Sequence, residues 1–308
     1  MNLLEVISRF STQQECIHYL EYKRWQSQPS CPYCQSQLSS PRKGEFRHQC
    51  NSCNRSYSVL VGTIFEDTKL PLPKWFMAIA LILNAKKGIS SRQLSRDLGI
   101  NRNTAWYLQM RIRQVMQEKD DQDDDQQGLL QGIVEVDETY LGGQMRNHSK
   151  QQRQQRRENQ AQITGMQHKQ PVVGLLEREG KVILKVLEKA HGKAIQPIVE
   201  QTVSKQATVV TDGFGGYAAL NKHVKSHQVL NHQKEEYRRG DYHTNTIEGL
   251  WTLLKRGIYG QYHKVSAKHL QRYLNEFTFK YNHRGQKNVF DTLITKGLNK
   301  LELIPVNS

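Results

Sequence analysis

The spacing of apolar residues predicts helices in the first third of the chain and a mixture of strands and helices beyond it. Helical spacing follows Pro71 and Pro73, and it continues into two short helices separated by Gly99. After residue 130 the apolar residues alternate or form β-branched runs, which predict strands. The expected strands are 132–143, the two strands of a hairpin over 171–188 that turns at Glu179 and Gly180, and 207–212. The expected helices are 74–88, 91–98, 101–116, 193–203, 243–260 and 266–281.

The C-terminal elements follow one another as three strands, a helix, a fourth strand and then helices. A sheet with helices on its faces accommodates this order, so we expect an α/β fold with a mixed sheet. Residues 118–128 are acidic and of low complexity, which is typical of a solvated linker. Residues 144–170 are rich in Gln and Arg, and we expect them to form a long basic loop near nucleic acid.

The helix expected over residues 243–260 carries two stripes of side chains. One stripe is apolar and recurs at helical spacing, as in an ordinary buried face; it consists of Ile247, Leu250, Trp251, Leu254 and Ile258. The other stripe has the same spacing on a different face and is polar; it consists of Asn245, Glu248, Thr252 and Lys255. This grouping of a carboxylate, a carboxamide and an ammonium makes the polar stripe a candidate functional surface.

The composition indicates a basic protein without a membrane segment. Lys and Arg number 44 against 29 Asp and Glu, which makes a net charge of +15 over 308 residues, and 37% of the residues are apolar. Such a charge favours a polyanionic partner, most simply nucleic acid, although a merely soluble basic protein has the same balance. Residues 1–25 do not resemble a signal peptide, and no stretch approaches the ~18 apolar residues of a membrane helix. We therefore expect a cytoplasmic chain with reduced thiols.

Four of the five cysteines are paired by their spacing. CPYC holds Cys31 and Cys34, and CNSC holds Cys50 and Cys53 after 15 intervening residues. Each pair forms one knuckle, and two knuckles complete the tetrahedral shell of four thiolates that Zn²⁺ prefers. A disulfide framework is disfavoured in a reducing compartment, and redox chemistry needs only one pair. We predict a structural zinc ribbon with a hairpin between the pairs, and a buried, unreactive Cys16.

Residues 91–116 have the spacing of a helix-turn-helix. Gly99 makes the turn, and Asn101 is a suitable N-cap for the second helix. Basic and amide side chains on this helix suit contact with the base edges and phosphates of double-stranded DNA. A helical hairpin that only packs on the next domain is the alternative. The candidate DNA-binding residues are Arg92, Arg102, Asn103, Arg111 and Arg113.

Three carboxylates of the C-terminal half are candidates for one site. Asp137 lies near the end of a predicted strand, Asp212 ends another, and Glu248 belongs to the polar stripe. Acids from two strands and a helix can hold two Mg²⁺ ions ~3.5–4 Å apart, and Lys255 on the same helix face can hold a phosphate. Taken singly, each acid is more often a turn residue or a solvated glutamate, so only the combination favours catalysis.

These motifs resemble those of the bacterial insertion-sequence transposases of the ISXO type. The resemblance runs in order from about residue 10 to 295 and is carried by CPYC and CNSC, VEVDETYLGG, VVTDGFGGY and HTNTIEGLWTLLKRGIYGQYHKVSAKHLQRYLNEFTFKYNHR. It implies a DDE enzyme with a ribonuclease H-like core and two catalytic Mg²⁺ or Mn²⁺ ions. It further implies cleavage of double-stranded DNA at the ends of an insertion sequence and strand transfer into target DNA, by a homo-oligomer associated with the nucleoid. Asp137 and Asp212 correspond to the first two acids.

The third acid is ambiguous, because some members of this family are described with glutamate and a lysine, and others with asparagine. Asn245 and Glu248 lie one turn apart on the same helix face. A neutral amide binds a hard cation less well than a carboxylate does, and six residues separate Glu248 from Lys255, which suits a DDE-type signature. We therefore expect Glu248 to be the metal ligand and Asn245 to contact metal or phosphate beside it.

The motifs divide the predicted chain into four parts. They are an N-terminal helix and zinc ribbon over 1–65, a helix-turn-helix region over 66–117, an acidic linker over 118–128, and a ribonuclease H-like catalytic domain over 129–300. A transcription regulator with a zinc ribbon and a helix-turn-helix is one alternative, but it does not explain the three acids. A ribonuclease H-like nuclease of repair or recombination is the other, and it shares the chemistry without requiring strand transfer. Short inverted repeats flanking the gene would favour transposition.

Overall fold

The computed structural model describes residues 1–117, 129–142, 169–213, 215–217, 220–231 and 236–299. The predicted linker over 118–128 lies outside the described residues, as does the predicted basic loop from 144 to 168. The chain forms two compact units, one of Met1–Gln117 with His283–Ser308 and the other of Glu118–Asn282. No described helix is both long and apolar enough to cross a membrane.

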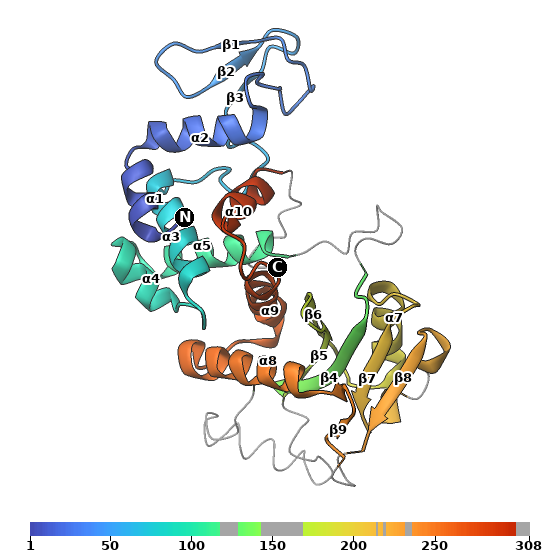
Figure 1. The fold of residues 1–308 in the computed structure, drawn as a ribbon. Helices are drawn as coiled ribbons and strands as arrows, with labels where there is room; N and C mark the ends of the chain where they lie inside the picture. The colour runs from blue at the N-terminus through green and yellow to red at the C-terminus, as the bar shows by residue number, and fades with distance from the viewer. Residues whose placement is uncertain (118–128, 143–168, 214, 218–219, 232–235, 300–308) are drawn as a thin grey trace, which may run out of the picture. The chain divides into compact units, whose positions relative to one another are not determined.

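The first unit is mainly helical (Figure 1). Aromatic side chains hold its helices together: the rings of Phe10 and Phe76 lie 4.8 Å apart, and the ring of Phe290 lies 5.8 Å from that of Phe76. Capping boxes begin the first two helices, where Asn2 and Thr12 each exchange hydrogen bonds with a glutamate three residues on. The helices are α1 (Leu3–Arg9), α2 (Gln13–Trp25), α3 (Leu72–Asn84), α4 (Ser91–Leu98), α5 (Arg102–Val115) and α10 (Val289–Leu298).

Helix α10 packs with the N-terminal helices, whereas the sequence analysis assigned residues 283–300 to the catalytic domain. Asp291 accepts hydrogen bonds from the Tyr19 hydroxyl at 2.6 Å and from Lys23 Nζ at 3.2 Å. Gly297 lies so close to Ile64 that an added Cβ would come within 2.9 Å of its Cδ1. The structure places this helix differently because its apolar face is covered by residues far away in the sequence.

The four paired cysteines lie on and beside a small sheet with the order β1-β2-β3. Strands β1 (Ser39–Pro41) and β2 (His48–Cys50) pair antiparallel, and β3 (Ser56–Tyr57) pairs with β2. The predicted hairpin between the two cysteine pairs is therefore confirmed.

Helices α4 and α5 form the predicted helix-turn-helix. Gly99 lies between them in the left-handed conformation, with φ 58° and ψ 47°, which favours glycine. Asn101 caps α5, since its side-chain oxygen accepts a hydrogen bond from the Asn103 amide at 2.8 Å. Leu94 and Leu98 of α4 are buried.

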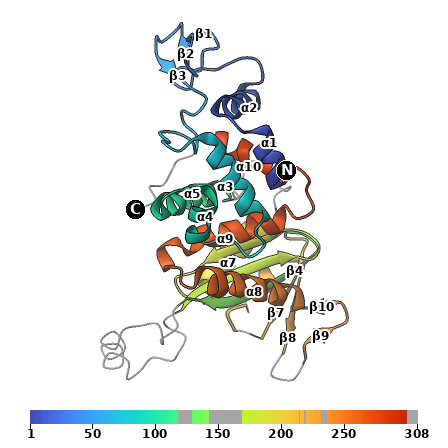
Figure 2. The same cartoon turned by 90° about the vertical axis from the view of Figure 1, so that its left-hand side faces the viewer.

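A five-stranded mixed sheet with the order β6-β5-β4-β7-β8 forms the centre of the second unit (Figure 2). Strands β6, β5 and β4 pair antiparallel, whereas β7 and β8 run parallel to β4. This ribonuclease H-like arrangement confirms the predicted α/β fold class. Strand β8 was not predicted, because its sequence is mostly polar and only its last residue is buried. The elements are β4 (Ile133–Leu141), β5 (Gln170–Glu177), β6 (Val182–Val186), α7 (Gly192–Thr202), β7 (Thr208–Asp212), β8 (Ser226–Leu230), β9 (Arg238–Arg239), β10 (Tyr242–His243), α8 (Asn245–Arg256), a π-helical turn (Gly257–Tyr262) and α9 (Ala267–Asn282).

Helices cover both faces of this sheet. Helix α7 packs through Ile195 and Val199 against one face, in a core that includes Val134 of β4 and Val209 of β7. Helix α8 lies on the other face, where its side chains reach Gly174 of β5. Strands β4 and β5 therefore present alternate residues to α7 and to α8.

Helix α9 covers the edge strand β6. The Gln271 side chain accepts a hydrogen bond from the Val186 amide at 2.9 Å and donates one to the Leu184 carbonyl at 3.0 Å. The Asn282 side chain makes the same two kinds of bond to Val182. Amide side chains thus satisfy backbone groups that an exposed edge would leave available for pairing with another chain.

Candidate active site and metal centre

Asp137 and Asp212 lie on adjacent parallel strands. Val136 of β4 pairs with Thr211 of β7, so the next residue of each strand is an aspartate, on the face that α8 covers. Asp212 ends β7, as predicted. Asp137 lies at the middle of β4 rather than near its end, because β4 continues to Leu141 alongside β5 after its pairing with β7 has stopped.

Hydrogen bonds orient the Asp137 carboxylate through both of its oxygens. The Trp251 indole donates to Oδ2 at 2.8 Å, and the Glu138 amide donates to Oδ1 at 2.8 Å. Burial raises the pKa of Asp137 to about 6, against the hydrogen bond from Trp251, and repulsion by Asp212 and Glu248 adds to the rise. Asp212 and Glu248 are therefore both close enough to Asp137 to act on its carboxylate electrostatically.

The two stripes of α8 lie as the sequence predicts. Ile247, Leu250, Trp251 and Leu254 are buried, whereas Asn245, Glu248, Thr252 and Lys255 are exposed. The Glu248 carboxylate accepts a hydrogen bond at 3.1 Å from the hydroxyl of Thr244, a side chain that is itself buried. Glu248 is thus directed toward the N-terminal end of α8.

A fourth acid, Glu135, is completely buried two residues before Asp137 and was missed by the sequence analysis. Its carboxylate accepts hydrogen bonds from the Ile247 amide at 2.9 Å and the Thr246 hydroxyl at 2.8 Å. Arg178, from the hairpin of β5 and β6, forms an ion pair with it at 3.0 Å. Glu135 therefore caps the start of α8 in place of an N-cap side chain, since Thr244 makes no such bond. One feature of the sequence could have pointed to Glu135: it lies two residues before Asp137 in a predicted strand, so both side chains share one face of the sheet.

We expect Glu135→Ala to destabilise the second unit by about 3 kcal/mol, because it removes one partner of a buried ion pair and leaves donors of α8 without an acceptor. Urea unfolding followed by circular dichroism measures the change. Glu188→Ala, which removes an exposed carboxylate just beyond β6, is the matched control and should cost less than about 0.5 kcal/mol. Equal stability of the two variants would contradict the capping role.

Glu138 is a further acid that the sequence analysis did not select. It points to the opposite face of β4, where it accepts a hydrogen bond from the hydroxyl of Tyr217, a buried side chain in the glycine-rich segment after β7. Burial raises the pKa of Glu138 to about 7, opposed by that hydrogen bond, and repulsion by Asp212 and Asp137 contributes to the rise. Glu138 and Tyr217 thus tie the segment that follows Asp212 to β4.

Within the described part of the chain, the one group of three or more potential metal ligands whose donor atoms all lie within 4.8 Å is the cysteine cluster. The structure thus brings the four thiols together as tightly as a single ion requires. The donor atoms of Asp137, Asp212 and Glu248 are not gathered to that degree.

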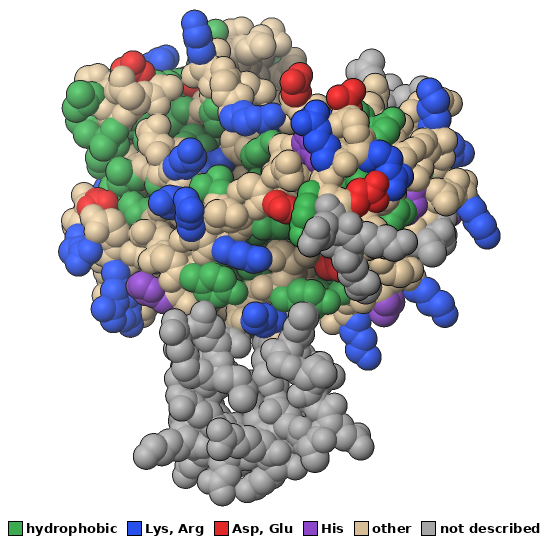
Figure 3. Space-filling view, turned by 60° about the horizontal axis from the view of Figure 1, so that its bottom comes forward, with side chains coloured by type: hydrophobic (Ala, Val, Ile, Leu, Met, Phe, Trp, Pro, Cys, Tyr) green, Lys and Arg blue, Asp and Glu red, His purple; other side chains and the backbone are tan. Residues whose placement is uncertain are grey.

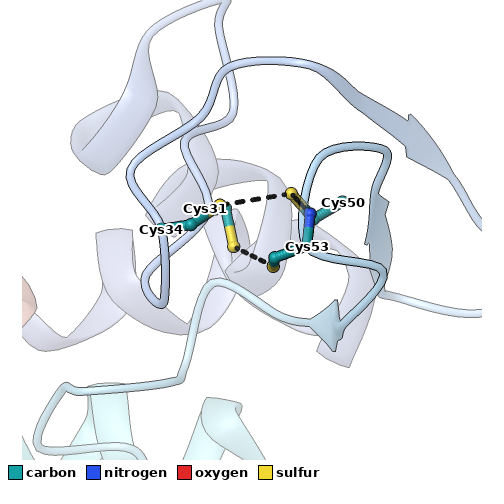
Figure 4. Close-up of side chains that lie close together, drawn as sticks. All are labelled: Cys31, Cys34, Cys50 and Cys53. Atoms are coloured by element: carbon teal, nitrogen blue, oxygen red, sulfur yellow. Dashed lines mark hydrogen bonds between the residues drawn. The ribbon is translucent and has the colours of Figure 1, made fainter.

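The four cysteines have the geometry of a zinc ribbon (Figure 4). The Sγ atoms of Cys31 and Cys53 lie 3.7 Å apart, and those of Cys34 and Cys50 lie 3.5 Å apart. An ideal tetrahedron with Zn–S bonds of ~2.3 Å has edges of about 3.8 Å, so these positions fit Zn²⁺.

The two knuckles repeat each other's backbone hydrogen bonds. The Gln35 amide donates to the Cys31 carbonyl and the Asn54 amide donates to the Cys50 carbonyl, at 2.8 and 3.0 Å. The Cys53 amide also donates to Cys50 Sγ at 3.5 Å, and this bond is the main reason that the pKa of Cys50 falls to about 6. A thiol that loses its proton readily is suited to metal binding.

The structure separates the five candidate DNA-binding residues into two groups. Arg92, Arg102 and Asn103 are exposed, the last two at the start of α5. Arg113 is fully buried, and Arg111 is half-buried, donating to the Glu66 carbonyl at 3.2 Å. The prediction that Arg113 contacts DNA is therefore wrong, because its side chain lies in the interior of the first unit. Contact of Arg111 with DNA stays a prediction.

Comparison with known protein families gives two matches, which cover separate segments of the chain. Residues 129–282 match the family described as the ISXO2-like transposase domain. Residues 11–56 match the transposase zinc-ribbon domain. The two matched segments include the candidate acids and the four paired cysteines, respectively.

Two curated proteins are similar to the chain. An uncharacterized protein in transposable element ISH50 of Halobacterium salinarum is 26% identical over 279 residues, covering 88% of this chain and 91% of the relative. An uncharacterized transposase-like protein of Haemophilus influenzae is 26% identical over 113 residues, covering 37% of this chain and 90% of the relative.

Solved structures of Mos1 assemblies are among those that align with the chain. The Mos1 strand transfer complex aligns with a TM-score of 0.29 and 12% identity, covering 72% of this chain and 78% of that one. A pre-cleavage Mos1 transpososome aligns with a TM-score of 0.24 and 11% identity, covering 71% and 78%.

Proposed function

The chain belongs to the ISXO2-like transposase domain family, and from this premise we propose that it moves an insertion sequence by a metal-dependent, DDE-type reaction. Asp137, Asp212 and Glu248 are the proposed acids, with Asn245 beside them. Lys255 on the same face of α8 is the proposed phosphate contact. Membership of a transposase family speaks against the alternative of a transcription regulator.

One observation carries the proposal: Asp137 and Asp212 extend side by side from parallel strands toward the helix whose exposed face carries Glu248. Repulsion by Asp212 and by Glu248 contributes to the raised pKa of Asp137, so both carboxylates lie close to it. Carboxylates that crowd together repel one another, and a divalent cation relieves that repulsion.

The donor set suits Mg²⁺ or Mn²⁺, which are hard cations that prefer carboxylate oxygens. Two ions ~3.5–4 Å apart can share such ligands, so carboxylates that bind different ions need not lie in contact with each other. When bound, these ions activate the attacking water or 3′-hydroxyl and stabilise the leaving oxygen. The chain's own part is to hold Asp137 and Asp212 on neighbouring strands and Glu248 on α8, and to place the Lys255 ammonium where it can bind a phosphate.

Double-stranded DNA is the proposed partner. The net charge of +15 favours a polyanion, and Lys and Arg side chains are spread over the face drawn in Figure 3. The exposed start of α5 offers Arg102 and Asn103 for base edges, and the exposed Arg92 of α4 is available for a phosphate. We further propose that the protein acts in the cytoplasm as a homo-oligomer on DNA.

The test is incubation of the full chain with labelled DNA that carries the element's ends, with Mg²⁺, with Mn²⁺ and with a chelator. Ion-dependent cleavage at the ends, followed by products joined to target DNA, is the expected result. Cleavage without joined products would favour the ribonuclease H-like nuclease alternative. Equal product with and without chelator would overturn the metal-dependent mechanism.

We expect Arg102→Ala and Asn103→Ala each to weaken binding to the element's ends about 5- to 160-fold, because a side chain that contacts base edges contributes about 1–3 kcal/mol. Electrophoretic mobility shifts with end DNA and with scrambled DNA measure this effect. Ion-dependent nicking of nonspecific DNA should be largely retained.

The matched control for Arg102→Ala is Lys86→Ala, which also removes an exposed positive charge from the first unit. It should weaken binding to end DNA and scrambled DNA equally and only slightly. If both α5 variants bind the ends as tightly as the unaltered protein, the recognition surface lies elsewhere.

A further inference from the structure

Trp251 belongs to the buried apolar face of α8 and also forms a hydrogen bond with one of the proposed acids. Its side chain is 4% exposed, and its indole N–H donates to Asp137 Oδ2 at 2.8 Å. An indole nitrogen is a donor only, so it can neither bind a cation nor take a proton from the carboxylate. Because the Glu138 amide occupies the other oxygen of Asp137, the two donors together define the plane of the carboxylate.

The indole reaches Asp137 through space left by a glycine. Gly174 of β5 is the cross-strand partner of Asp137 and lies on the same face of the sheet. A Cβ at Gly174 would lie 2.6 Å from Cη2 and 2.7 Å from Cζ2 of Trp251, and 3.1 Å from Cδ1 of Ile247. These distances are shorter than van der Waals contact allows, so any larger residue at 174 would displace the ring.

We propose that Trp251 is a positioning residue for the reaction, which holds the Asp137 carboxylate in the orientation that binds the divalent cation, and that Gly174 provides the room it needs. The inference rests on the proposed function, since it assumes that Asp137 binds the ion. An ionised carboxylate has about four lone-pair sites, and the two donors use one on each oxygen, which leaves one on each for the cation. Hydrogen-bond partners of metal ligands tune affinity in this way at many metal sites.

The test compares Trp251→Phe with Ile247→Val in the full chain. Phenylalanine retains an aromatic ring on α8 and removes the N–H donor, whereas Ile247→Val changes packing against the same glycine and leaves the hydrogen bond intact. We measure Mn²⁺ affinity by titration calorimetry without DNA and the Mn²⁺ concentration that gives half-maximal cleavage. Trp251→Phe should weaken both about 10- to 100-fold, whereas Ile247→Val should lower the melting temperature and leave both unchanged.

Gly174→Ala provides a second route to the same result, because it keeps the indole N–H and displaces the ring. It should also weaken Mn²⁺ binding. In a double-mutant cycle, Gly174→Ala should cost less in the Trp251→Phe background than in the unaltered chain, because the shorter ring leaves room for a Cβ.

Two results would overturn the inference. Mn²⁺ affinity equal to that of the unaltered chain in a folded Trp251→Phe variant would mean that the indole only packs. Fully additive effects of Gly174→Ala and Trp251→Phe on Mn²⁺ affinity would mean that the glycine does not act through the ring. Failure of the proposed function has a different signature, namely Mn²⁺ affinity and cleavage that are unchanged in Asp137→Asn.

Discussion

Asp137→Ala and Asp212→Ala are each expected to abolish DNA cleavage and strand transfer while DNA binding persists. Each change removes a carboxylate from the proposed ion site and leaves the exposed basic surface intact. The loss should exceed the roughly 10- to 100-fold cost of removing a partner that only orients a metal ligand. Cleavage of labelled end DNA in Mg²⁺ and in Mn²⁺, with a mobility shift on the same DNA, separates catalysis from binding.

The third acid is decided by comparing Glu248→Gln with Asn245→Ala. If Glu248 is the ligand, its near-isosteric neutralisation should lower the cleavage rate by at least about 100-fold, and Asn245→Ala should cost less. Both variants should fold, because both side chains are exposed on α8, away from buried Ile247 and Leu254.

The matched control for this comparison is Thr252→Ala, which alters the same exposed stripe without removing a charge or a carboxylate. It should retain nearly full cleavage. An active Glu248→Gln with an inactive Asn245→Ala would assign the role to Asn245, and the ions would then depend on Asp137 and Asp212 for their negative ligands.

Cys31→Ser is expected to lose stoichiometric zinc and to unfold the zinc ribbon locally. The ribbon has little else to stabilise it: its buried cluster comprises Cys31, Cys50 and Tyr57, with Trp25, Cys53 and Val61 packed against them. Binding of structural zinc releases about 10–16 kcal/mol in small zinc modules, far more than so few apolar contacts contribute. Zinc content by elemental analysis and limited proteolysis within residues 26–57 measure the two effects.

Cys16→Ala is the control for the zinc experiment. Cys16 is fully buried in α2, and its Sγ lies 3.9 Å from the Phe10 carbonyl, outside the cysteine cluster. The variant should keep one zinc per chain and resist protease within the ribbon as the unaltered chain does. Full zinc retention by Cys31→Ser would count against a four-cysteine site.

The sequence alone determined the features that depend on near neighbours. Two Cys-x-x-Cys knuckles form because each pair is closed by its own backbone hydrogen bonds. Asn101 and Gly99 set the helix-turn-helix because capping and a left-handed turn are local matters. The helical period likewise separated the buried stripe of α8 from the exposed one that contains Glu248.

Only the tertiary structure decided which faces meet. Periodicity shows that a helix has an apolar side, but the side of α10 could pack on either unit, and the structure places it against Phe76 and Tyr19. The burial of Arg113 could not be predicted from the sequence either, since a basic residue is usually solvated unless distant elements enclose it.

The same reason explains what was missed at the candidate site. Glu135 is stable in the interior because Arg178, 43 residues away, and the start of α8, more than 100 residues away, converge on its carboxylate. Trp251 has the spacing of an ordinary core residue, and only the register of β5 against β4 sets Gly174 beneath its ring and Asp137 beside its N–H. Residue types and spacing therefore supplied the proposed acids, whereas the groups that hold them in place became visible only when strands and helices distant in the sequence were brought together.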